Sequence, residues 1–370
     1  MTFAEQLKKI RQVRELTQEQ LAECVSVEIR QVRELTQEQL AERVSVEMIS
    51  KYESGEMMPS SSTLIALSSV LGVDISYFFR EISVQLKTQP TFRMSTKSEK
   101  LEKKEQQQII AQTQDALERQ LEILEICQSQ GEYVVDTGLR RVVQSYEDIE
   151  VLSHDVRAAW NLGLDPIKNL MEVAESHGFK IILVDGPMKF EAATFMEEEL
   201  GPIISLRRGA PKERQRFSLA HELGHYFILE ESLGYQSWDA EKMANRFAAA
   251  LLMPRELLVQ DIGPNRKSLN PEELCLLRKK YGASTQAILA RMESLGIISH
   301  DLKKLAMESD GENHWSSRPG GEAYSDTERP RLLRKLVFRA VTEGVISEQK
   351  GRELLGADGE VLMMSSGETA

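Results

Sequence analysis

The sequence predicts an α+β fold that is mostly α and is divided among several domains. At 370 residues the chain is longer than one ordinary hydrophobic core accommodates. Apolar residues recur at helical spacing over most of its length, and only two short runs rich in β-branched residues, 180–184 and 202–206, have the pattern of strands. These observations favour helical domains around one small sheet.

Composition and charge exclude several classes of protein. No apolar run approaches the roughly 18 residues that a membrane span needs, and no signal peptide opens the chain, so we expect a cytoplasmic protein without a membrane partner. The cysteines Cys24, Cys127 and Cys275 are far apart and odd in number, which argues against a disulfide framework and a cysteine zinc site. A net charge of −12 argues against indiscriminate polyanion binding, so any contact with DNA must be local and specific.

The N-terminal region contains a tandem duplication. Residues 10–28 read IRQVRELTQEQLAECVSVE, and residues 29–47 repeat them with Arg43 in place of Cys24. Two copies are too few for a solenoid, so the repeat indicates duplication of one helical segment. Alignment of the copies places Phe3 and Leu7, the apolar contacts expected of the first helix, opposite Ala22 and Ser26. The helix that precedes the second copy should therefore pack less well than the helix that precedes the first. Either residues 1–14 still dock across a looped-out copy, or the helical core is weakened.

The second copy continues into a predicted helix-turn-helix. Thr36 and Gln39 form a capping box at the start of one helix. Ser45 caps a second helix, Val46 to Tyr52, which ends at Ser54-Gly55. A short helix, a turn and a second helix form the geometry that lays side chains in the major groove of DNA.

The predicted DNA contacts lie on these two helices. We expect a base-reading face on the second helix, and a contact of Gln37 with a phosphate at the start of the first. The predicted base-reading residues are Glu47, Met48, Ser50 and Lys51. The alternative is a helical bundle used only for protein contact, because the window 29–82 has five basic and eight acidic residues.

The stretch from Ile29 to about Phe79 resembles the XRE (lambda repressor-like) family. Tyr52-Glu53-Ser54-Gly55 and the following Pro59 carry the resemblance. It implies a double-stranded DNA operator as partner, and a homodimer is usual for this type of DNA reader.

An HExxH motif lies at His221 to His225, in the sequence SLAHELGH. Because positions i and i+4 share one helical face, His221 and His225 can bind one metal ion while Glu222 points at its bound water. Catalytic zinc takes three protein ligands and lowers the pKa of a water in the fourth position towards ~7. We expect Glu222 to act as general base and then as proton donor to the leaving amine. The alternative is a chance HExxH in an ordinary helix.

The third metal ligand is expected from the next helical segment. Glu241 and Asn245 share a face one turn apart, so Glu241 can coordinate while Asn245 orients a ligand. The nearer Glu230 and Glu231 follow the motif too soon for the chain to reverse. Asp239 lies on a different face from Asn245.

The stretch from about Asp148 to Leu258 resembles the ImmA/IrrE family of metallopeptidases. The matching residues are Val156-Arg157, Trp160, Leu162-Gly163, Pro166-Ile167, Asn169-Leu170, the block Arg216 to His225, Glu241, Ala244 to Ala249, and Leu251 to Pro254. The resemblance implies a thermolysin-like, gluzincin-type zinc fold in which His221, His225 and Glu241 bind Zn2+ and Glu222 is the catalytic carboxylate. Known members are similar in acting as regulators that cleave a helix-turn-helix repressor.

Other candidates for the site are weaker. No residue can be assigned to stabilise the oxyanion; Tyr226 and Tyr235 are candidates, with aromatic packing as the alternative for each. The remaining histidines lack ligand spacing, and we expect them at the surface or in packing.

The motifs and composition shifts predict seven segments. They are a helix-turn-helix domain at 1–82, a linker helix at 83–130, a metallopeptidase domain at 131–262, a helical extension at 263–306, a flexible linker at 307–327, a C-terminal helical unit at 328–356 and a disordered tail at 357–370. The linker helix either pairs with another chain or is a solvated spacer. The C-terminal unit either contacts a partner or covers the core.

The combined motifs predict a DNA-binding transcriptional regulator with a zinc endopeptidase domain. Its expected protein substrate is a partner repressor, a toxin-system component or the chain itself. The alternative is a non-proteolytic repressor or antitoxin whose zinc site is structural or sensory. An intact Glu222 beside both histidines favours the enzyme.

Overall fold

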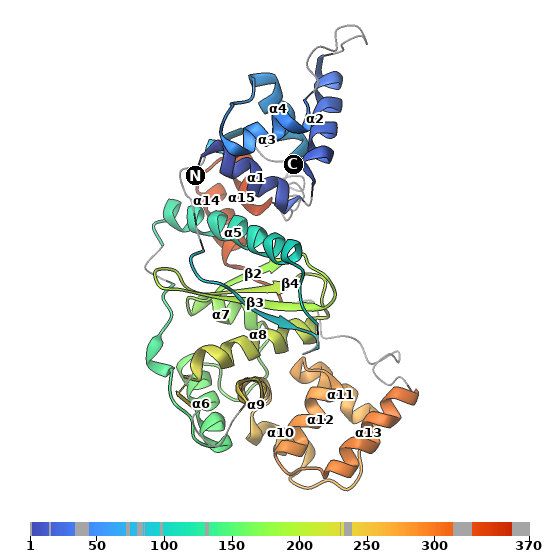
Figure 1. The fold of residues 1–370 in the computed structure, drawn as a ribbon. Coiled ribbons are helices and arrows are strands. Elements are labelled where there is room, and N and C mark those ends of the chain that lie inside the picture. Colours follow the sequence, from blue (N-terminus) through green and yellow to red (C-terminus); the bar gives the residue numbers. More distant parts are fainter. Residues whose placement is uncertain are drawn as a thin grey trace, which may run out of the picture.

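The computed structural model describes residues 2–14, 16–33, 44–71, 75–79, 84, 86–96, 99–129, 133–229, 231–232, 239–313 and 328–356. The chain forms an elongated molecule in which an N-terminal helical domain, a central sheet with helices on both faces, and a further group of helices follow one another (Figure 1). The predicted α+β, mostly helical fold class is confirmed. Among the described helices, none is long and apolar enough to cross a membrane.

The N-terminal domain consists of α1 (Phe3–Val13), α2 (Gln18–Arg33), α3 (Val46–Ser54), α4 (Ser61–Leu71) and the short 3-10 helix η2 (Ile75–Phe79). Thr2 and Glu5 form a capping box at the start of α1. Phe3 and Leu7 of α1 are buried in one apolar core with Leu21 of α2 and Ile49 of α3. Residues 2–14 therefore dock in the helical core.

The helix before α3, α2, takes residues 18–28 from the first copy of the duplication and residues 29–33 from the second. Thr17 and Gln20 form the capping box that the identical sequence predicts for Thr36 and Gln39, which lie outside the described residues. Arg11 and Gln18, also in the first copy, both hold the carboxylate of Glu53 in α3. The first copy therefore joins α1 to α3.

The sheet has the strand order β1-β3-β4-β2, formed by β1 (Thr91–Met94), β2 (Lys180–Val184), β3 (Phe190–Glu197) and β4 (Gly201–Arg207). β2 and β4 are parallel, and the two other pairings are antiparallel. The predicted strands 180–184 and 202–206 are β2 and β4. The apolar character of β2 is continuous because helices cover both faces of the sheet.

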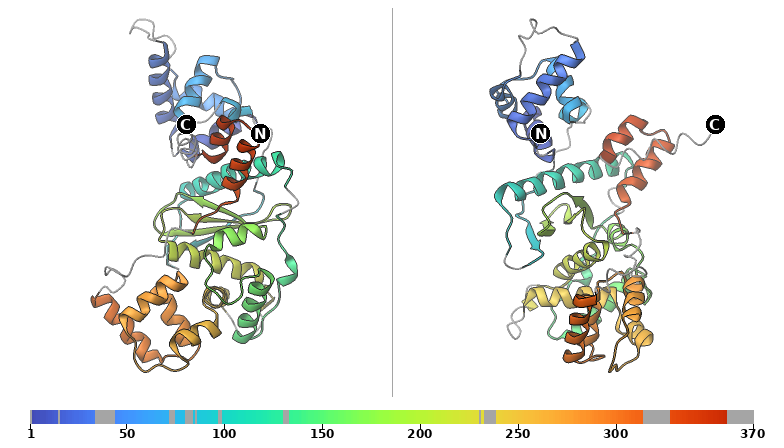
Figure 2. Two further views of the ribbon diagram at one scale, coloured as in Figure 1. Left: turned by 180° about the vertical axis from the view of Figure 1, so that it is seen from behind. Right: turned by 90° about the vertical axis from the view of Figure 1, so that its right-hand side faces the viewer.

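The linker helix α5 (Lys103–Ile126) lies across one face of the sheet (Figures 1 and 2). Its Ile109 and Leu117 pack with Ile182 and Phe195 of the strands, and the buried ion pair between Lys9 and Glu118 joins it to α1. The helix expected from this polar stretch is therefore part of the central core of the molecule.

The other face of the sheet carries α8 (Lys212–Phe227), with α6 (Tyr146–Ala159), α7 (Leu170–Ser176) and α9 (Ala240–Leu252) around it. Beyond them lie α10 (Arg255–Ile262), α11 (Pro271–Tyr281), α12 (Thr285–Ser294) and α13 (His300–Asn313) (Figure 1). The core under the sheet includes Ile204, Leu219, Phe247 and Leu289, which are fully buried. The short 3-10 helix η4 (Thr137–Leu139) precedes α6.

The C-terminal unit, α14 (Leu332–Thr342) and α15 (Glu348–Leu355), packs on α5. Just before α14, Glu328 is fully buried; it accepts a 2.7 Å bond from Arg216 of α8 and a 2.8 Å bond from the backbone of Met171. The unit therefore covers the core of its own chain, as one of the two sequence interpretations expected.

Candidate metal centre

The helix α8 presents the two motif histidines to one point. Pro211 stands at its N-cap and Glu213 lies in its first turn, and the helix ends at Phe227, two residues after His225. Because the histidines are one turn apart, their rings face the same side of α8, and their Nε2 atoms lie 2.9 Å apart. His221 is 1% exposed and His225 is 30% exposed, so one ring is enclosed and the other borders the solvent.

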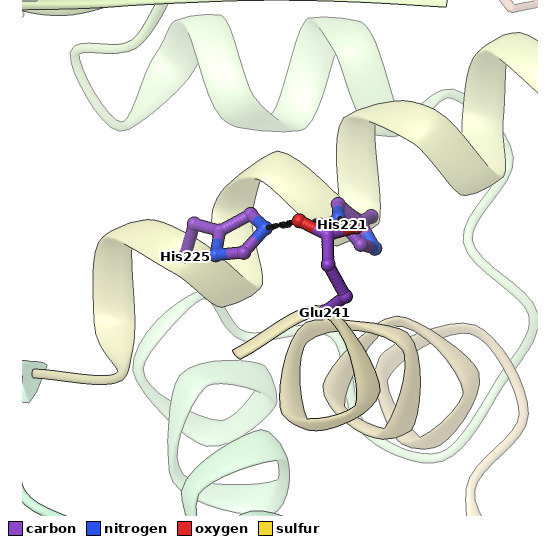
Figure 3. Close-up of side chains that lie close together, drawn as sticks. All are labelled: His221, His225 and Glu241. Carbon is purple, nitrogen blue, oxygen red and sulfur yellow. Dashed lines mark hydrogen bonds and ion pairs between the residues drawn. The ribbon is translucent and has the colours of Figure 1, made fainter. Parts of the chain in front are cut away.

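The helix α9 brings Glu241 to the same point. Asp239 caps α9 and places Glu241 in its first turn. The Glu241 carboxylate lies 3.4 Å from Nε2 of His221 and 3.2 Å from Nε2 of His225 (Figure 3). The helices approach this closely because Gly224 has no side chain, and a Cβ there would lie 3.0 Å from the Cα of Ala244.

These three side chains fit a zinc ion. Donor atoms about 2.0–2.1 Å from zinc at tetrahedral angles are themselves separated by roughly 3.3 Å, close to the separations found among His221, His225 and Glu241. Two imidazoles and one carboxylate could together hold a metal ion, and catalytic zinc sites use three such ligands and leave the fourth position for water. Asn245 lies with its Oδ1 2.9 Å from Nδ1 of His221. When Nδ1 of His221 donates this bond, Nε2 keeps its lone pair for a metal.

The charges around the centre favour a metal-binding state. Burial lowers the pKa of His221, although its bond to Glu241 opposes this shift, so the ring is favoured in the neutral form that binds metal. When their Nε2 atoms carry protons, His221 and His225 donate hydrogen bonds to Glu241 that hold its pKa well below its usual range. Glu241 is therefore ionised throughout the neutral range.

Glu222 lies beside the ligands but turns to the sheet. It is 3% exposed, and its Oε2 accepts a 2.7 Å hydrogen bond from Oγ1 of Thr194 on β3. This bond fixes the carboxylate between α8 and β3. Within the described part of the chain, no protein group bonds to Oε1 of Glu222, so this oxygen is available to a reactant.

The chain matches two family models. A model of the IrrE N-terminal-like domain matches residues 174–293, from α7 to α12, and a helix-turn-helix model matches residues 28–78. The chain joins a helix-turn-helix domain to an IrrE N-terminal-like domain. The match to the IrrE-like domain contains His221, Glu222, His225 and Glu241, and it extends into the helices after residue 262. A search of curated proteins finds no match for the chain.

The helix-turn-helix match and the structure use different copies of the duplication. The match begins at residue 28 and therefore takes the second copy. In the structure, Leu21, Ala22 and Val25 of the first copy are buried in the core with residues of α1 and α3, and the second copy adds Ile29 of the same helix. The sequence thus offers two equivalent segments for one position in the helix-turn-helix domain.

The second helix of the helix-turn-helix is α3, and most of the residues predicted to contact DNA lie on it. Ser45 caps it through the backbone of Met48, and Gly55 ends it in the left-handed conformation with φ of 79°. Ile49 and Tyr52 anchor α3 in the core. Glu47, Ser50 and Lys51 are exposed, Met48 is half-buried, and Gln37 lies outside the described residues.

The structure places the other sequence candidates away from the centre. Tyr226 is buried in aromatic packing against Phe179, with the guanidinium of Arg140 over its ring, and Tyr235 lies outside the described residues. Asp239 caps α9. The other described histidines have structural neighbours: His177 stacks on Trp160, and His154 and His300 lie beside acidic side chains.

Sequence reasoning missed two residues at the centre, Thr194 and Arg93. Thr194 lies on β3, whose sequence FEAATFME has too few β-branched residues to predict a strand. Arg93 lies on β1, and its Nε is 3.3 Å from Glu191 of β3. Burial lowers the pKa of Arg93, while the charges of Glu222, Glu191 and Glu241 oppose this. Neither residue belongs to a motif, so only the fold brings them to the site.

Proposed function

We propose that the chain is a DNA-binding transcriptional regulator whose IrrE-like domain is a zinc-dependent endopeptidase. The observation that carries the proposal is the position of Glu222, buried and held by Thr194 beside three side chains that fit zinc. A purely structural zinc site needs no such carboxylate, because structural sites use four protein ligands and leave no position open.

The chemistry follows from the donor set. Zinc, when bound by His221, His225 and Glu241, would polarise a water molecule and a substrate carbonyl group. Glu222 accepts one proton of the attacking water at Oε1 as the water oxygen bonds to the carbonyl carbon. Glu222 then returns this proton to the amide nitrogen as the carbon–nitrogen bond breaks, leaving a carboxylic acid and an amine. Thr194 holds the other oxygen of Glu222 in place through both steps.

The substrate is proposed to be a regulatory protein. The helix-turn-helix domain on the same chain supports a target found at the operator: a partner repressor, a toxin-system component or the chain itself. On α3, exposed Ser50 and Lys51 are proposed to contact bases, while buried Ile49 and Tyr52 fix the helix in the domain. Binding of DNA as a homodimer is part of the same proposal.

The decisive experiment compares wild type with Glu222→Gln. The amide has the same shape but cannot accept the proton, so the variant should bind zinc with unchanged affinity and lose proteolysis. Both proteins are loaded with zinc and incubated alone and with proteins encoded beside the operator, and fragments are identified by mass spectrometry. If regulation in cells is the same with Glu222→Gln, the non-proteolytic alternative, a repressor or antitoxin with a sensory or structural zinc site, replaces the enzyme.

A further inference from the structure

The strand β1 comes from the segment between the helix-turn-helix domain and α5, yet it forms one edge of the sheet (Figures 1 and 2). It pairs antiparallel with β3, and Thr91 lies directly opposite Thr194, the residue that holds Glu222. A four-residue segment that is remote from the HExxH motif in sequence is therefore one strand away from the proposed general base.

The side chain of Arg93 lies on the face of β1 that is turned to α8. Its neighbours Phe92 and Met94 pack in the cluster on the α5 side of the sheet, so residue 93 lies on the opposite face. The contacts agree with this placement: the guanidinium lies 6.0 Å from the ring centre of Phe217 on α8 and forms its ion pair with Glu191. Arg93 is thus between the sheet and the helix that carries the histidines.

The electrostatic partners of Arg93 are the residues of the centre. The charges of Glu222 and Glu241, together with that of the directly paired Glu191, all oppose the lowering of the Arg93 pKa by burial. Its charge also lowers the pKa of His221. Arg93 and Glu222 form no direct ion pair among the described residues.

One nitrogen of Arg93 is left without a partner. Nη1 is buried and makes no hydrogen bond to any described residue. A buried donor without an acceptor is costly, and a charged donor more so. A substrate carbonyl oxygen bound between Arg93 and Glu222 would satisfy this donor, and a carbonyl oxygen that gains negative charge would satisfy it better.

We propose that Arg93 is a catalytic residue: it donates a hydrogen bond from Nη1 to the carbonyl oxygen of the scissile peptide and stabilises the negative charge that develops there. This assignment rests on the proposed peptidase function. It also makes the metal centre dependent on β1, so the segment that follows the DNA-binding domain completes the site. The contact forms no covalent bond and moves no proton.

The variants for the test are Arg93→Ala, Arg93→Lys and the matched control Arg214→Ala. Arg214 is the suitable control because it also pairs with Glu191, at 3.5 Å, but is half exposed. Both alanine variants remove an ion-pair partner of Glu191, but only Arg93→Ala removes the proposed hydrogen-bond donor to substrate. An effect seen in Arg93→Ala alone therefore reports on the donor. Thermal melts and zinc affinity are measured first, and all variants should bind zinc as wild type does because Arg93 is not a ligand.

The first readout is binding of N-phosphoryl-leucyl-tryptophan, a tetrahedral anionic peptide analogue, to the zinc-loaded proteins by calorimetry. Arg93→Ala should bind this probe on the order of 100-fold more weakly than wild type, Arg93→Lys should recover part of the affinity, and Arg214→Ala should bind normally. The second readout is cleavage: Arg93→Ala should lower kcat on the order of 100-fold with little change in KM.

The outcomes separate this inference from the proposed function. If the wild type cleaves protein and Arg93→Ala binds the probe as tightly as the wild type does, the proposed role of Arg93 is overturned and the peptidase proposal stands. A protein that cleaves nothing, but whose probe affinity depends on Arg93, supports the anion contact while the peptidase proposal fails. Faster cleavage by Arg93→Ala also overturns the assignment, because β1 would then be an obstacle to substrate.

Discussion

Replacement of Gly224 by alanine should loosen the metal centre without touching a ligand. A Cβ at this position would lie 3.0 Å from Cα and 3.1 Å from the carbonyl oxygen of Ala244, and 3.2 Å from Cβ of Phe247, whereas ordinary contact begins at 3.4 Å. Since two of these neighbours are backbone atoms, α9 must move away from α8 by up to the 0.4 Å shortfall. Zinc ligands tolerate about 0.2 Å, so Glu241, one turn before Ala244, leaves its position.

The expected result for Gly224→Ala is a zinc affinity roughly 10- to 100-fold lower and a stability lower by about 1–3 kcal/mol from overpacking. The affinity is measured by competition with a chromophoric chelator, and the stability by urea unfolding. Gly209→Ala is the matched control, because a Cβ there meets no atom within 4 Å. If Gly224→Ala binds zinc as tightly as Gly209→Ala, the close approach of α8 and α9 does not set the ligand geometry.

Further predictions concern the domain contacts. Glu328→Ala removes the carboxylate that pairs with fully buried Arg216, and urea unfolding should show an unfolding free energy lower by roughly 3–5 kcal/mol. A decrease below about 1 kcal/mol would contradict a stabilising role for this buried ion pair. Burial raises the pKa of Glu175 to about 8, above ~4.3 in an unfolded chain, so its contribution to stability is complete at acidic pH and is lost as pH rises to 8. In the wild type the unfolding free energy should fall across this window, and Glu175→Gln should make that fall shallower by about 1.4 kcal/mol per pH unit. If the unfolding free energy of the variant depends on pH as that of the wild type does, the raised pKa of Glu175 is refuted. Arg11→Ala should lower the melting temperature of the helix-turn-helix domain, whereas the same change at Arg30, its counterpart in the second copy, should not; the reverse ranking would show that the second copy docks.

Local chemistry made part of the site predictable. His221 and His225 had to share one helical face because of their spacing, and Glu241 with Asn245 had to share another. The structure brings His221, His225 and Glu241 together, with Asn245 against the ring of His221. The strands β2 and β4 were visible because burial on both faces requires continuous apolar runs.

Tertiary pairing hid the rest of the site. β3 contains Glu191 and Thr194, which no strand pattern selects, and both turn to α8 only after the sheet forms. Arg93 reaches the centre through the pairing of β1 with β3, and no local signal connects a strand of four residues to a motif so distant in the chain. The duplication was a different difficulty, because two nearly identical segments have the same local preferences and only long-range contacts such as Arg11 with Glu53 distinguish them.

Anomalous diffraction at the zinc absorption edge, from zinc-soaked crystals of the full chain, tests the central claim most directly. The account predicts one strong peak about 2.0–2.2 Å from Nε2 of His221, Nε2 of His225 and a carboxylate oxygen of Glu241. A map with no peak there, or with zinc held elsewhere and the Glu241 carboxylate turned away from both rings, would contradict the account.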